Sequence, residues 1–109
     1  MDFEFANSKL RRLCENAKEA QRRLGPHSAR KLRARLSDLV AANAVGDLVA
    51  GRPHPLKGER SHEFSVSLHG GDRLVFEAAG ENPPLTMDGS IDWNNVSRVR
   101  ITEIGDYHD

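Results

Sequence analysis

The chain has 109 residues, of which 38% are hydrophobic and 29% charged, and its 16 basic and 16 acidic side chains give a formal net charge of zero. This length suits one compact domain and excludes a catalytic domain joined to a separate regulatory one, so we expect residues 1–109 to form a single domain. The composition excludes a disordered chain, and the zero net charge gives no support to nucleic-acid binding, because affinity for phosphate comes largely from Lys and Arg.

The first residues of the chain show neither a basic leader nor an apolar run, and no stretch approaches the roughly 18 apolar residues that a membrane span requires. We therefore expect a cytoplasmic protein with no membrane association.

Residues 2–6 alternate polar and apolar side chains. This alternation predicts a short first strand with Phe3 and Phe5 on one face.

A first amphipathic helix is predicted over residues 7–24, with Asn7 or Ser8 as its cap and Gly25-Pro26 as its end. Its apolar stripe includes Cys14. Because Cys14 is the single cysteine of the chain, it cannot form an intramolecular disulfide. Its apolar neighbours at helical spacing predict a buried, reduced thiol.

A second amphipathic helix is predicted over residues 28–43, antiparallel to the first. Four of its side chains are expected to point inward: Leu32, Leu36, Leu39 and Val40. Residues 45–50 are expected to make one further turn. Residues 51–58 contain two glycines and two prolines, which exclude regular structure there and predict a rigid connector.

The second half of the chain has the pattern of strands. Residues 64–69 and 73–78 alternate apolar and polar side chains around Gly70-Gly71, which tolerates positive φ, and this pattern predicts a β-hairpin. Residues 80–95 are predicted to form a long loop, and residues 97–104 a third strand. A strand, a helical hairpin and then an antiparallel meander, with the helices on one face of the sheet, make an α+β fold.

The charges are distributed unevenly along this order of elements. Residues 1–60 carry 13 Lys and Arg against 7 Asp and Glu, a difference of +6, and residues 61–109 carry 3 against 9, a difference of −6. A polarised molecule can bind phosphate with one face and a basic partner with another. Two solvated helices followed by an acidic sheet edge produce the same pattern, so the sequence leaves both interpretations open.

Chemically active side chains gather in three places outside the expected core. The connector contains His54 and Lys57, and the middle strand begins with Arg73. The C-terminal segment contains Asp106, Tyr107 and His108. In a meander these three places can lie close together. Their side chains suit the cleavage of RNA, which brings its own nucleophile, the 2′-hydroxyl. The protein then needs a base, an acid and cations at the phosphate, with no metal or cofactor.

Each residue type has a natural role in that reaction. Histidine serves as acid or base near neutral pH. Arg73 offers a planar fork to two phosphate oxygens, and Lys57 offers a compact charge. Asp106 is expected to orient a histidine or an arginine, and Tyr107 to hydrogen-bond the phosphate or stack on a base.

The order of elements, the connector sequence HPLKG, the hairpin sequence SVSLHGGDRLVF and the terminal DYH resemble the HigB branch of the RelE/ParE toxins over nearly the whole chain. The resemblance implies a RelE/ParE-like fold and a ribosome-dependent endonuclease that cuts mRNA in the A site. It also implies a partner, a HigA-like helix-turn-helix antitoxin encoded beside it. Operator DNA would be bound only through the complex with that antitoxin.

Position by position, the resemblance places His54 and Lys57 in the connector motif, Arg73 in the middle strand, and Asp106, Tyr107 and His108 in the terminal motif. It makes His108 the preferred general acid or base and His54 its complement. It implies that Lys57 and Arg73 stabilise the phosphate in the transition state.

Other interpretations stay open at this point. A metal site built from His54, Asp106 and His108 matches no strong zinc spacing. A ParE-like protein would poison DNA gyrase without cutting RNA, and an inactive relative would act as a corepressor with its antitoxin. In the long loop, Trp93 either stacks on a base or anchors the loop to the sheet.

Overall fold

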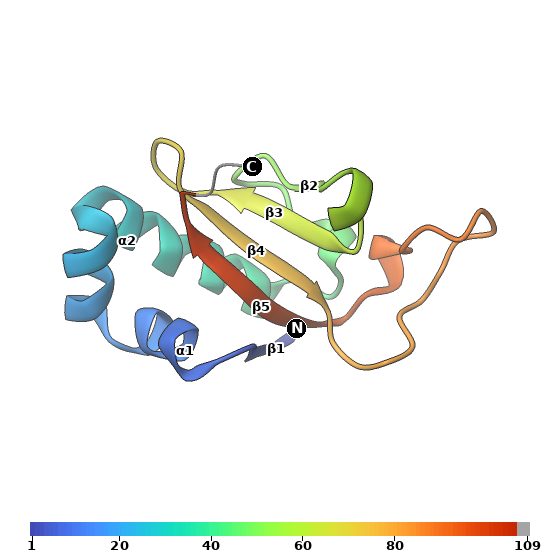
Figure 1. The fold of residues 1–109 in the computed structure, drawn as a ribbon, viewed down its shortest axis with the longest axis horizontal. Helices are drawn as coiled ribbons and strands as arrows, with labels where there is room; N and C mark the ends of the chain where they lie inside the picture. The colour runs from blue at the N-terminus through green and yellow to red at the C-terminus, as the bar shows by residue number, and fades with distance from the viewer. Residues whose placement is uncertain (107–109) are drawn as a thin grey trace.

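The computed structural model describes residues 1–106, which form a five-stranded sheet with two helices on one of its faces (Figure 1). The strands are β1 (Asp2–Phe5), β2 (His54–Pro55), β3 (Glu63–Ser67), β4 (Arg73–Ala78) and β5 (Arg98–Gly105). The helices are α1 (Ser8–Glu15) and α2 (Ala17–Ala41), with short 3₁₀ turns η1 (Val45–Asp47), η2 (Gly58–Arg60) and η3 (Trp93–Asn95). The predicted α+β class is confirmed.

The strands lie in the order β1-β5-β4-β3-β2. The pairs β2/β3, β3/β4 and β4/β5 are antiparallel, as the meander predicts, and β1 lies parallel to β5 at one edge. A register shift between Val75 and Phe76 interrupts the pairing of β4 with β5. The strand expected over residues 97–104 forms within one residue of those limits.

The first predicted helix is not continuous. The helix expected over residues 7–24 is broken at Asn16, whose backbone is extended (φ −122°, ψ 105°) and whose side chain accepts hydrogen bonds from the backbone N–H groups of Lys18 and Glu19. Asn16 therefore caps a new helix instead of continuing the old one. The expected break at Gly25 is present: Gly25 has φ 84°, which divides α2 into two segments and lets Pro26 begin the second.

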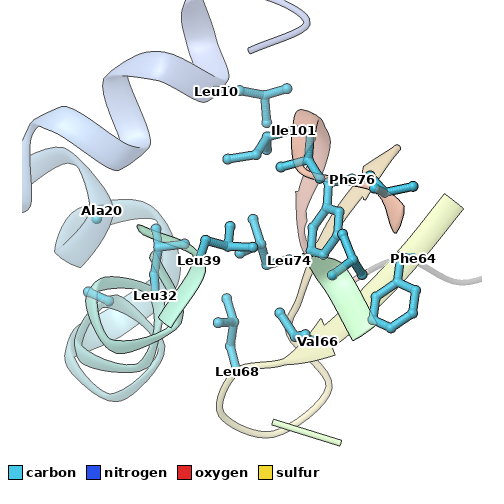
Figure 2. Close-up of a cluster of buried hydrophobic side chains, with 14 residues drawn as sticks. Leu10, Ala20, Leu32, Leu39, Phe64, Val66, Leu68, Leu74, Phe76 and Ile101 are labelled. Atoms are coloured by element: carbon cyan, nitrogen blue, oxygen red, sulfur yellow. The ribbon is translucent and has the colours of Figure 1, made fainter. Parts of the chain in front are cut away.

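The core lies between the helices and the sheet (Figure 2). Leu10, Leu32 and Leu39 of the helices pack against a cluster that includes Leu74 and Phe76 of the central strand β4. Leu32 and Leu39 are buried as predicted. The prediction for Val40 is wrong, because its side chain is 63% exposed.

Both connecting segments contain more structure than their sequences indicate. The connector over residues 51–58 was expected to be irregular, but His54–Pro55 pairs with β3 as the edge strand β2. The loop between β4 and β5 projects from the body of the molecule (Figure 1). Trp93 anchors it, with its ring centroid 4.9 Å from that of the buried Phe64, which confirms the anchoring role for this tryptophan.

The tip of the β3–β4 hairpin is attached to the start of the second segment of α2. The buried hydroxyl of Ser28 donates a hydrogen bond of 2.5 Å to Asp72 and lies 3.2 Å from the carbonyl oxygen of His69. The ring centroids of His27 and His69 are 4.9 Å apart. These contacts fix the hairpin that carries Arg73 relative to the helical layer.

Candidate functional site

Two of the residues predicted to form the site, His54 and Arg73, line one open hollow of about 520 Å³. The other residues of its wall are Arg52, Pro53 and Ser67. The hollow is therefore lined by one histidine and two arginines, which come from the connector and from the start of β4.

The sheet explains why these residues meet. His54 of β2 lies opposite Ser65 of β3, and Ser67, two residues further along β3, lies opposite Arg73 of β4. Residues two apart in a strand share a face of the sheet. Since Phe64 and Val66 of β3 belong to the core, Ser65 and Ser67 face away from the helices, and so does the hollow.

The ring of His54 is held in one orientation by the backbone beside it. Its Nδ1 lies 2.7 Å from the carbonyl oxygen of Arg52. A carbonyl oxygen can only accept, so Nδ1 carries the hydrogen of this bond. In the neutral ring, Nε2 then has a free lone pair and can accept a proton.

The other predicted site residues have different relations to the hollow. Asp106 follows β5, and its carboxylate atoms lie 3.1 Å from the position that a Cβ atom on Gly71 would occupy, near the start of β4. Lys57 is exposed just before η2 and does not line the hollow. Tyr107 and His108 lie outside the described residues.

An ion-pair network connects the end of the connector to the sheet. The guanidinium of Arg60 donates two hydrogen bonds to the buried carboxylate of Glu63, at 3.1 and 3.0 Å, and one of 3.1 Å to Glu103 of β5. The hydroxyl of Thr102 also donates to Glu63, at 3.3 Å. Burial alone would raise the pKa of Glu63, but the hydrogen bonds and the charge of Arg60 outweigh it and lower that pKa.

Glu63 is therefore expected to make stability depend on pH. A carboxyl group with a lowered pKa in the folded state stabilises the fold above its unfolded pKa, and this contribution is lost as the pH falls through the folded value. We expect the free energy of unfolding to drop more steeply for the native chain than for Glu63→Gln below about pH 4.5, the ordinary value for this group. Urea unfolding between pH 7 and pH 3 measures the difference.

Glu81→Gln is the matched control for this experiment, because Glu81 is an exposed acid of the long loop. It is expected to follow the pH dependence of the native chain. Parallel curves for the native chain and Glu63→Gln would contradict the role given to the Arg60 network.

Some of these residues could not be selected from the sequence. Arg52 stands next to the connector motif, and only its backbone conformation distinguishes it from the many other arginines of the chain. Ser67 can be placed on the face of Arg73 by strand alternation, which is a usable signal. Arg60 and Glu63 lie three residues apart, but Glu103 joins them from β5, and no pattern in the sequence marks that partner.

The described part of the chain has neither a metal cluster nor a membrane-spanning helix. Within residues 1–106, no three His, Cys, Asp or Glu side chains lie close enough to hold a metal ion. No helix in the same range combines the length and hydrophobicity of a bilayer span.

Cys14 is a half-buried free thiol whose pKa is raised to about 12, first by burial and then by the charge of Glu15, which keeps it protonated.

Comparison with known proteins adds one finding. No family model matches the sequence, and no curated protein matches it. Among solved structures, the chain is similar to a YoeB/ParE toxin from Agrobacterium tumefaciens, with a TM-score of 0.62, 15% sequence identity, and coverage of 99% of this chain and 100% of that one. The RelE/ParE-like fold implied by the sequence resemblance is thus confirmed: the chain has the α+β fold of this YoeB/ParE toxin.

Proposed function

We propose that the protein is the toxin of a type II toxin–antitoxin pair, of the HigB type, and that it cuts mRNA in the ribosomal A site without a metal. The observation that carries the proposal is the single hollow lined by His54, whose ring is oriented by the backbone, together with Arg52 and Arg73. The fold shared with a YoeB/ParE toxin supports the same assignment.

The chemistry follows from this set of groups. One imidazole takes the proton of the RNA 2′-hydroxyl, the 2′-oxygen bonds to the adjacent phosphorus, and the bond from phosphorus to the 5′-oxygen breaks. A second group returns a proton to the leaving 5′-oxygen, and the products carry a 2′,3′-cyclic phosphate and a 5′-hydroxyl. Arg52 and Arg73 stabilise the charge on the phosphate.

The C-terminal residues keep the roles that the sequence predicts for them. His108 is proposed as the partner of His54 in proton transfer, and Tyr107 as a contact to the phosphate or to a base. Asp106, which lies near the start of β4, is proposed to orient Arg73 or one of the imidazoles. Lys57, whose side chain is exposed, is proposed to attract RNA electrostatically.

The proposal includes a partner and a location. A HigA-like helix-turn-helix antitoxin is proposed to neutralise the protein, and operator DNA to be bound only through their complex. The substrate, mRNA on the ribosome, places the protein in the cytoplasm.

Several exposed cations of the helices have no ion pair with any residue that the structure describes, and they suit an acidic antitoxin segment or ribosomal RNA: Lys9, Arg12, Lys18, Arg30, Lys31 and Arg33.

The test is induction of the protein in bacteria, followed by mapping of mRNA 5′ ends. We expect new 5′-hydroxyl ends within minutes, and we expect Arg73→Ala to reduce them at least tenfold at equal protein level. In a purified translation complex, a 2′-deoxy substitution at the cleaved nucleotide is expected to abolish cleavage, because it removes the nucleophile. Cleavage that survives the 2′-deoxy substitution would contradict the reaction.

The same induction separates the alternative functions. A poison of DNA gyrase would activate a DNA-damage reporter while translation continues at first. An inactive corepressor would leave transcripts intact and bind operator DNA together with its antitoxin. Either result, with full-length mRNA, would replace the nuclease proposal.

A further inference from the structure

A strained bend precedes His54 in the connector. Arg52 has φ 52° and is the one non-glycine residue of the described chain, residues 1–106, with a positive φ. Gly51 before it has φ 86°. Residues other than glycine rarely adopt this left-handed backbone conformation, and where one does, the surrounding structure must hold it.

The bend is held by the sheet. The carbonyl oxygen of Gly51 accepts a hydrogen bond of 2.6 Å from the backbone N–H of Ser67. A Cβ atom on Gly51 would lie 3.0 Å from Cδ of Arg35 and 3.1 Å from the carbonyl oxygen of Ser67, so a larger residue would require α2 or β3 to shift and would be strained at this φ. The bend is therefore fixed relative to Ser67, the residue opposite Arg73 in the sheet.

The bend determines the direction of the Arg52 carbonyl group. With Arg52 in the left-handed conformation, its carbonyl oxygen lies 2.7 Å from Nδ1 of His54. The same backbone segment thus contacts β3 through Gly51 and the imidazole through Arg52. If the turn served only to reverse the chain, the strained residue, Arg52, would not also need to be the one whose carbonyl group contacts the ring of His54.

We propose that the left-handed backbone of Arg52 is a positioning device that makes His54 the base of the reaction, an inference that rests on the proposed function. The hydrogen bond fixes the tautomer with hydrogen on Nδ1, so Nε2 takes the proton of the 2′-hydroxyl as the 2′-oxygen bonds to phosphorus. The imidazolium that results keeps its Nδ1–H on the carbonyl oxygen of Arg52. The proton for the leaving 5′-oxygen then comes from a different group.

Two variants of Arg52 isolate the backbone from the side chain. Arg52→Asn and Arg52→Val both remove the guanidinium group. Asparagine tolerates the left-handed conformation, whereas a β-branched residue is a genuine outlier there. Any difference between the two variants therefore reports the bend and not the lost charge.

The first readout is the tautomer of His54, measured by ¹⁵N NMR of the histidine side chains of the whole protein at a pH where the ring is neutral. We expect the Nδ1–H form in the native chain and in Arg52→Asn, and a shift toward the Nε2–H form, which free histidine prefers, in Arg52→Val. An Nε2–H tautomer in the native chain would overturn the inference. The same is true of identical tautomers in the two variants when the amide spectrum shows both folded.

The second readout is cleavage of ribosome-bound mRNA. We expect Arg52→Val to cleave at least tenfold more slowly than Arg52→Asn, with the loss in the rate at saturating ribosome complex and not in binding. Equal rates with different tautomers would show that the tautomer does not matter for catalysis, and would overturn the base assignment. If the native chain cleaves no RNA, the proposed function fails, whereas the NMR result still decides whether Arg52 sets the tautomer.

Discussion

Replacing His54 with alanine is expected to lower mRNA cleavage by about 10²–10⁴-fold, the range that a positioned proton-transfer group contributes. The side chain of His54 is exposed and belongs to a two-residue edge strand, so its loss should not unfold the protein. The rate is measured in single-turnover reactions with a ribosome programmed with mRNA. The matching stability measurement is the urea midpoint, which should stay within the error of the native value.

Two controls make this result specific. His62→Ala removes another exposed histidine, one whose Nε2 lies 3.6 Å from Glu63, and it should cleave like the native chain. Imidazole added to His54→Ala should restore part of the rate, because a soluble base can replace the missing ring. Cleavage by His54→Ala at the native rate would remove His54 from the reaction.

Replacing Phe76 with alanine is expected to lower the free energy of unfolding by about 3–5 kcal/mol, the usual loss for a fully buried aromatic residue. Phe76 lies in the central strand β4, has no exposed surface, and stacks on Phe64 with ring centroids 5.6 Å apart. Because folded domains have about 5–15 kcal/mol in total, this loss should leave the variant close to unfolding at 37 °C.

Urea unfolding at 25 °C measures this effect. Val49→Ala is the matched control, since Val49 is 87% exposed, and its change should stay within about 0.5 kcal/mol. A loss for Phe76→Ala no larger than that of the control would mean that β4 is not the centre of the core.

The hairpin and the fold class were predictable because their signals are local. Apolar side chains alternate on both sides of Gly70-Gly71, and β4 begins and ends at the predicted residues 73 and 78. Helical spacing alone predicts that Leu32 and Leu39 lie in the core, where the structure has them. In each case the side chains that determine the element lie within a few residues of one another.

The features that could not be predicted depend on distant partners or on one side chain with two possible uses. Asn16 continues a helical pattern, and only its capping bonds to Lys18 and Glu19 show that it interrupts the helix. The strand His54–Pro55 exists because β3 lies beside it. Since its proline-rich segment looks irregular, nothing local indicates that it joins a sheet.

The site was predictable only where local sequence motifs mark its residues. The motifs that contain His54 and Arg73 predict both as site residues, and the sheet brings both to one hollow. Arg52 could not be predicted, because its contribution is a backbone angle and the direction of its carbonyl group. Neither property can be read from residue type.

The two borders of the sheet have a consequence for behaviour at high concentration. One border, β2, is two residues long and includes Pro55, which has no N–H to offer another chain. The other, β1, has the exposed carboxylates of Asp2 and Glu4 at alternate positions. Short, proline-containing and charged borders disfavour the addition of strands from other molecules. The folded protein is therefore expected to resist amyloid-like aggregation, even during overproduction.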